Sequence, residues 1–131
     1  MLKHARQRRG GRPLRILIAD DDRDLATLFA MVLRKRGYQV FVAYDGPSGL
    51  RMARNIVPDL AILNFLMPGM TGVEVLRRLR SETRTRSIKA VVTSVAPRAA
   101  AEALAAGAEG FIQCPIRMPK LIAMVEENLG I

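Results

Sequence analysis

Residues 14–22 read Leu-Arg-Ile-Leu-Ile-Ala-Asp-Asp-Asp, a short apolar run that ends in three consecutive acids. An apolar run of this length without alternation predicts a strand that is buried on both faces of a sheet. Residues 24–36 then repeat apolar side chains at a period of 3.6, which predicts a helix with Asp22 as its N-cap. This stretch therefore predicts a buried strand, an acidic strand end and a helix in series.

The same unit recurs along the rest of the chain. Further apolar runs predict strands over 40–43, 60–63, 90–93 and 110–113, and periodic segments predict helices over 46–55, 73–80, 98–106 and 118–129. Right-handed crossovers between such strands give an open parallel sheet with helices on both faces. In sheets of this kind ligands bind at the carboxyl ends of the strands, so we expect any site among the residues that follow each strand.

Length and charge predict one folded domain with a basic N-terminal arm. The chain has 131 residues and a formal net charge of +9. Residues 1–15 contain six basic residues and no acid, and the first thirteen have no apolar period and end in Gly-Gly-Arg-Pro. We therefore expect residues 1–13 to be a flexible basic arm and residues 14–131 to be the domain.

The cysteine and hydropathy patterns bear on location. The single cysteine, Cys114, excludes an intramolecular disulfide and fits a reducing compartment, so a cytoplasmic location is expected. No apolar core follows the basic arm, as a signal peptide would require. No run of eighteen apolar residues is present, so no membrane partner is expected.

Polar residues follow four of the predicted strands. They are Asp20, Asp21, Asn64, Ser94 and Cys114. Adjacent carboxylates at a strand end repel one another unless they hold a cation with hard oxygen ligands, such as Mg²⁺. Asp22 and Asp24 are accounted for by helix capping and the helix dipole. The sequence therefore predicts a Mg²⁺ pocket, retained or ancestral, at Asp20 and Asp21.

These motifs together resemble the response-regulator receiver domain, the phospho-accepting module of two-component signalling. The resemblance covers nearly all of residues 14–131. It is carried, in order and at matching spacing, by Ile16–Asp22, Pro58–Asn64, Met67–Gly72, Val91–Ser94 and Ala106–Pro115. It implies a flavodoxin-like (βα)5 fold of the α/β class, with strand order 2-1-3-4-5 and a cis peptide before Pro115.

The resemblance also assigns roles at the strand ends. In this family an aspartate after the third strand attacks a phosphoryl group, an acidic pair holds Mg²⁺, and a hydroxyl and a lysine bind the phosphoryl oxygens. Asn64 stands at the acceptor position, Cys114 at the lysine position, Ser94 at the hydroxyl position and Phe111 at that of the switching aromatic. A neutral amide is a poor nucleophile and a thiol does not replace an ammonium group. We expect a naturally degenerate pseudo-receiver, not an enzyme, with weakened Mg²⁺ binding.

The resemblance implies a surface for a signalling partner or for a second copy of the chain. In the family this surface is formed by the fourth helix, the fifth strand and the fifth helix. Here it includes Arg98, Glu102, Phe111, Lys120 and Glu126.

Cys114 also permits a redox hypothesis. Acidic neighbours raise the pKa of a thiol and lower its reactivity, so a small, half-buried filler is the favoured interpretation.

Two alternative functions remain open. The basic arm and the arginines near the third predicted helix could bind nucleic acid or another acidic partner; these arginines are Arg77, Arg78, Arg80, Arg84 and Arg86. The Asp-x-Asp pattern at Asp20 and Asp22, with Ser94, also resembles the first motif of Mg²⁺-dependent phosphatases of the haloacid-dehalogenase type. The second acidic motif and the lysine of those enzymes are missing.

Overall fold

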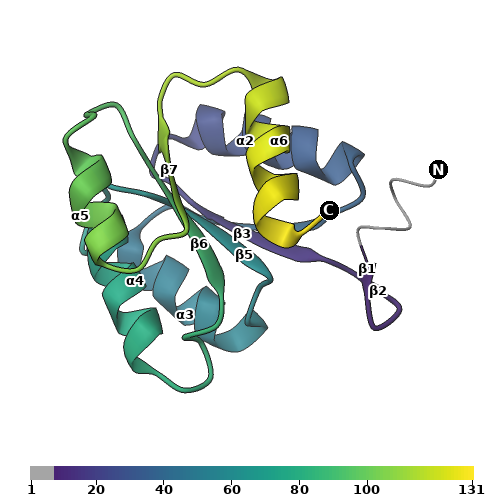
Figure 1. Ribbon diagram of the computed structural model, residues 1–131, viewed down its shortest axis with the longest axis horizontal. Helices are drawn as coiled ribbons and strands as arrows, with labels where there is room; N and C mark the ends of the chain where they lie inside the picture. The colour runs from purple at the N-terminus through teal and green to yellow at the C-terminus, as the bar shows by residue number, and fades with distance from the viewer. Residues whose placement is uncertain (1–7) are drawn as a thin grey trace.

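A computed structural model describes residues 8–131, and side-chain burial from Gly10 onward (Figure 1). The strands are β1 (Arg8–Arg9), β2 (Arg12–Pro13), β3 (Arg15–Ala19), β4 (Gln39–Ala43), β5 (Leu60–Asn64), β6 (Lys89–Ser94) and β7 (Gly110–Gln113). The helices are α2 (Arg23–Lys35), α3 (Gly46–Ile56), α4 (Gly72–Ser81), α5 (Ala99–Ala105) and α6 (Met118–Leu129).

The main sheet has five parallel strands in the order β4-β3-β5-β6-β7. Counted without the two short N-terminal strands, this is the predicted order 2-1-3-4-5. At its centre Leu17 pairs with Phe41 on one side and with Ala61 on the other. Because all five strands are parallel, their carboxyl ends lie along one edge of the sheet, as the predicted site requires.

Helices cover both faces of this sheet. Figure 1 shows α2 and α6 on one face and α3, α4 and α5 on the other. Successive strand residues alternate between the two resulting cores: Ile16 and Ile18 pack with Phe29 of α2, whereas Leu17 packs with Leu76 of α4. Burial on both faces explains why the strands are continuously apolar.

Side-chain caps fix where several helices begin. Asp22 accepts a hydrogen bond from the Leu25 N–H at 3.1 Å, which confirms it as the N-cap of α2. Thr71 and Glu74 form a reciprocal capping box at the start of α4. Beyond the end of α2, Gly37 has a φ of 97°, a left-handed conformation that glycine adopts without steric cost.

The basic N-terminal segment contains a hairpin where we expected no regular structure. Strands β1 and β2 pair antiparallel, with Arg9 opposite Arg12. Gly10 and Gly11 between them have φ values of 58° and 81°, which suit a two-residue hairpin turn. The Gly-Gly pair is therefore a turn signal rather than a sign of flexibility, and the rest of the predicted arm, residues 1–7, lies outside the described residues.

Within residues 8–131 no helix combines the length and apolar character needed to cross a membrane.

Arg80, predicted as part of a basic surface patch, instead joins three segments. Its guanidinium donates to the backbone oxygens of Gly107 at 2.9 Å, Ile88 at 2.6 Å and Arg86 at 3.0 Å. It also pairs with Glu109 at 2.9 Å, and Glu109 in turn accepts from a backbone N–H of β6. Arg80 therefore ties the end of α4 to the loops that precede β6 and β7.

Replacing Arg80 with glutamine should destabilise the domain by ~1–3 kcal/mol, because several charge-assisted hydrogen bonds to backbone oxygens are lost. Urea denaturation followed by circular dichroism measures this loss. Arg77→Gln is the matched control, since Arg77 is exposed on the same helix and should change stability by less than about 0.5 kcal/mol. Equal effects of the two substitutions would contradict the structural role of Arg80.

Candidate functional site

The predicted site residues converge at the carboxyl edge of the sheet. The Asn64 side chain at the end of β5 donates to Asp21 Oδ1, which follows β3, at 3.3 Å. The Cys114 N–H after β7 donates to the backbone oxygen of Ser94, the last residue of β6, at 2.9 Å. Asp20 lies in the neighbouring region of the edge, directly after β3.

Asp20 is the most deeply placed acid of the site. It is 3% exposed, and its Oδ1 accepts a hydrogen bond from the Asp22 N–H at 2.9 Å. Burial raises the pKa of this carboxyl to about 6; the charges of Asp21 and Asp22 also raise it, and the hydrogen bond from Asp22 opposes the shift. The ionised form of Asp20 therefore destabilises the folded state, and a cation bound nearby would reduce this destabilisation.

Asn64 uses both ends of its amide within the protein. Its Nδ2 donates to Asp21 at 3.3 Å and to the backbone oxygen of Leu66 at 2.8 Å. Its Oδ1 accepts from the Thr93 hydroxyl at 3.3 Å. The amide thus turns N–H groups toward the acids and its oxygen toward β6.

The Thr93 hydroxyl is a site residue that sequence reasoning missed. The sheet register pairs Asn64 with Thr93, and Thr93 is buried. The available signal was the position of Thr93 beside the predicted hydroxyl residue Ser94, at the end of the neighbouring strand.

The loop after Asn64 is held against β5 by a close backbone approach. The Gly72 N–H donates to the backbone oxygen of Phe65 at 2.9 Å. A Cβ at Gly72 would lie against the carbonyl group of Asn64. Only glycine fits there without displacing the backbone, so Gly72 fixes the position of the acceptor-site loop.

Ser94 and Cys114 occupy the remaining two site positions. Ser94 is buried, and its Oγ accepts a hydrogen bond from the Ala96 N–H at 3.0 Å. Cys114 is half-buried, and burial together with the charge of Asp20 raises the pKa of its thiol. The peptide bond between Cys114 and Pro115 is cis, which confirms that expectation.

The residues present fit a Mg²⁺ site with two carboxylate ligands. Mg²⁺ is bound in proteins by one or two carboxylates and keeps several waters, and Asp20 and Asp21 would supply those carboxylates. The end of β5 contributes the Asn64 amide, which donates one hydrogen bond to Asp21 and another to the backbone oxygen of Leu66. Among the residues described, no three His, Cys, Asp or Glu side chains gather in a cluster that would hold a metal.

The predicted interaction face is only partly assembled. Arg98, Glu102 and Lys120 are exposed, and Phe111 is half-buried against the core. Glu126 forms an ion pair with Arg36 at 2.9 Å. Arg36 directly follows α2, so the Glu126 side chain faces α2 and not the predicted interaction face.

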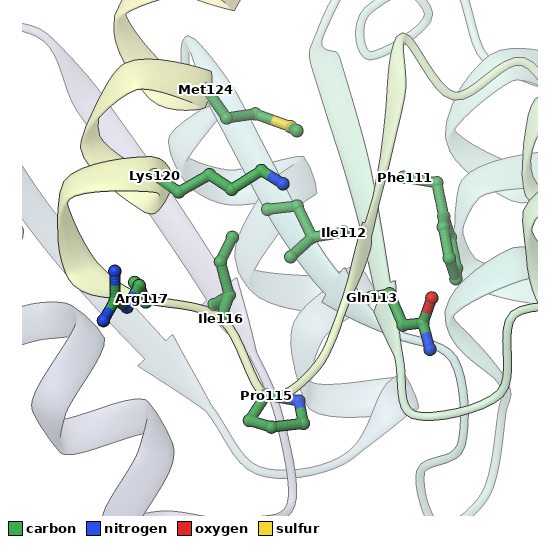
Figure 2. Close-up of a pocket in the computed structure, with 8 residues that line it drawn as sticks. All are labelled: Phe111, Ile112, Gln113, Pro115, Ile116, Arg117, Lys120 and Met124. Carbon is green, nitrogen blue, oxygen red and sulfur yellow. The ribbon is translucent and has the colours of Figure 1, made fainter.

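A cavity of about 270 Å³ lies between β7 and α6 (Figure 2). Figure 2 shows Lys120 and Met124 projecting from α6 beside Ile112, with Ile116 below them. The cavity combines an apolar interior with the cationic side chains of Arg117 and Lys120. Its lining residues are Phe111, Ile112, Gln113, Pro115, Ile116, Arg117, Lys120 and Met124.

Comparison with known proteins places these features in a family. A family model for the response regulator receiver domain matches residues 16–126. The DNA-binding response regulator MtrA of Mycobacterium tuberculosis is 34% identical over 124 residues, covering 88% of this chain and 50% of MtrA. The chain thus spans about half the length of this curated relative.

Two solved structures are similar in fold. A putative response regulator from Chloroflexus aurantiacus superposes with a TM-score of 0.86 at 28% identity, covering 92% of this chain and all of that one. The receiver domain of the sensor histidine kinase PA1611 from Pseudomonas aeruginosa gives a TM-score of 0.82, with 90% of this chain and 98% of that chain covered. At 21% identity the second likeness shows the fold alone; that structure has magnesium coordinated in its active-site cleft.

The raised pKa of Asp20 predicts a pH-dependent effect of Asp20→Asn. Because the pKa is raised in the folded state, ionisation of Asp20 lowers the free energy of unfolding. This destabilisation is fully present above about pH 6 and disappears as the pH falls toward the ordinary carboxyl range. The variant keeps an oxygen acceptor and should be more stable by ~1–2 kcal/mol near pH 7.5, since one pKa unit corresponds to ~1.4 kcal/mol and residual solvation reduces the full effect.

Urea denaturation in the presence of a chelator, near pH 7.5 and near pH 4, measures this difference. The advantage of the variant should disappear at the lower pH. An advantage of the same size at both values would show that the charge of Asp20 is not its cause.

Proposed function

This chain belongs to the response-regulator receiver domain family, and from that membership we propose that it is a pseudo-receiver, a signalling module that does not accept a phosphoryl group at the usual position. The observation that carries the proposal is the Asn64 amide at the end of β5, with its N–H groups donated to Asp21 and Leu66. Its signal then depends on protein contacts rather than on aspartyl phosphorylation.

The chemistry of the site supports this proposal at two positions. Formation of an acyl phosphate needs a carboxylate oxygen as nucleophile, and the Asn64 oxygen is neutral and accepts a hydrogen bond from Thr93. The cation expected after β7 is replaced by Cys114, whose raised pKa keeps its thiol neutral. Neither the attack nor the charge pairing of ordinary receivers is available from these side chains.

Residual Mg²⁺ binding belongs to the same proposal. Asp20 and Asp21 would hold the ion, which would neutralise their charge when bound. Asn64 adds no third carboxylate and already donates a hydrogen bond to Asp21, so the affinity should be below that of a three-carboxylate site.

Interaction through the α5, β7 and α6 face is the proposed output. Phe111 and the cavity beside it provide apolar surface, and Arg98, Glu102 and Lys120 provide exposed charges around it. Apolar surface with a charged rim is typical of protein interfaces. The proposed occupant is a signalling protein or a second copy of the chain.

Mass spectrometry of the intact protein after incubation with acetyl phosphate and Mg²⁺ tests the proposal. The wild-type protein should gain no phosphoryl group. Asn64→Asp should gain one that is labile to base, and adding Cys114→Lys should raise the modified fraction, because the nucleophile and then the cation are restored. A stoichiometric, base-labile phosphoryl group on the wild-type protein would overturn the proposal.

The phosphatase alternative receives no support from family membership, since receiver domains are signalling modules. Turnover of p-nitrophenyl phosphate with Mg²⁺ is the direct assay. Activity that survives Asn64→Ala but is lost in Asp20→Asn would revive it.

A further inference from the structure

The amino-end edge of the sheet, opposite the acidic site, is rich in cations. The β1–β2 hairpin extends from the amino end of strand β3 (Figure 1). Lys89 begins β6, and Arg84 and Arg86 lie in the turn before it; all three are exposed. Strands β3 and β6 are separated only by β5, hence by about 10 Å.

We call the hairpin positions Arg8, Arg9 and Arg12, together with Arg84, Arg86 and Lys89, the basic edge.

Of the acids beside the basic edge, Asp59 pairs with Arg12 of the edge itself, whereas Glu82 and Glu109 pair with arginines outside it. Asp59 accepts a hydrogen bond from the Arg15 N–H at 2.7 Å and lies 3.8 Å from Arg12. Glu82 pairs with Arg54 at 2.6 Å, and Glu109 pairs with Arg80 at 2.9 Å. In the described part of the chain, none of these carboxylates forms an ion pair with Arg84, Arg86 or Lys89, so the positive charge of the turn faces solvent.

The chemistry of the basic edge favours a phosphate polyanion. Arginine is the dominant cation, with 17 arginines and four lysines in the chain, and its planar fork binds phosphate oxygens in pairs. The exposed large hydrophobic side chains of residues 10–131, which a membrane surface would engage, lie on α2, on α5 and in the two site loops. A two-stranded β-ribbon is narrow enough to enter the major groove of duplex DNA.

We propose that the basic edge binds the phosphate backbone of duplex nucleic acid, with the β1–β2 hairpin as the element that follows the groove. This inference is independent of the proposed function, because the basic edge and the site at Asn64 lie at opposite ends of the strands. Binding is electrostatic and carries no base specificity, since no base-reading side chain is assigned.

Three variants of the full chain, each with three cations removed, test the proposal. The first is Arg84→Gln, Arg86→Gln and Lys89→Gln; the second is Arg8→Gln, Arg9→Gln and Arg12→Gln. The matched control is Arg23→Gln, Arg51→Gln and Arg77→Gln, which lowers the net charge equally by removing three exposed cations of α2, α3 and α4 that lie outside both the basic edge and the proposed interaction face. Fluorescence anisotropy of a labelled DNA duplex, from about 50 to 200 mM salt, measures affinity, and circular dichroism checks folding.

Wild-type binding should weaken steeply as salt rises. Each basic-edge variant should bind at least ~10-fold more weakly at the lowest salt, and its slope of log affinity against log salt should fall by about 2–3, because each phosphate contact contributes ~0.9. The control should stay within about threefold of the wild type. Failure of the wild type to bind, or equal losses in the control and the basic-edge variants, would overturn the proposal.

Binding to vesicles that contain phosphatidylserine is measured in parallel, and so, separately, is binding to poly-glutamate. Tighter binding to either than to the duplex, with the same loss in the basic-edge variants, would assign the surface to a different partner and would also overturn it.

Discussion

A strand that is apolar on both faces is stable in water only if both faces are covered, and β3 meets this condition from Ile16 onward. Its residues Ile16 to Ala19 are at most 1% exposed. One set of side chains packs against α2 and α6, and the other against the helices of the opposite face. The chain order of strand and helix follows, since each crossover must return to the sheet with the same hand. This packing also carries Asp20 into a buried position at the strand end, and the raised pKa of its carboxyl results from that placement.

Under the proposed function, the domain keeps the geometry of its site while losing the phosphorylation chemistry. The negative charge of an acidic pair at a buried strand end needs compensation, and a cation with hard oxygen ligands, such as Mg²⁺, can supply it. Here the Asn64 amide donates one hydrogen bond to Asp21, and the backbone N–H of Asp22 donates another to Asp20. Neutral donors therefore provide part of the stabilisation, while Gly72 keeps the neighbouring loop in contact with β5. Under the same proposal, the reactive side chains differ from those of ordinary receivers, while the backbone that positions them keeps the receiver fold.

The fold and the convergence of the site could be predicted from the sequence because both depend on strongly patterned features. Continuous apolar runs, helical periods and polar residues at strand ends are local signals that the parallel sheet brings together. The roles of Arg80 and Glu126 could not be predicted in this way. Both are charged residues whose partners, Gly107 and Arg36, are distant in sequence, and periodicity does not indicate which neighbour a long side chain will reach. The orientation of the Asn64 amide likewise depends on Thr93 across the sheet, and the hairpin depends on the φ angles of two glycines.

The hairpin leads directly into β3, whose residues Ile16 to Ala19 are all buried. Only Leu14, itself buried, separates β2 from β3, and β3 ends at the acidic cluster. A pull on the hairpin would therefore load β3 along its own axis, against the hydrogen bonds to β4 and β5 on its two sides. In this shear geometry many hydrogen bonds carry the load together. The hairpin is thus mechanically coupled to the acidic site at the opposite end of the domain through β3.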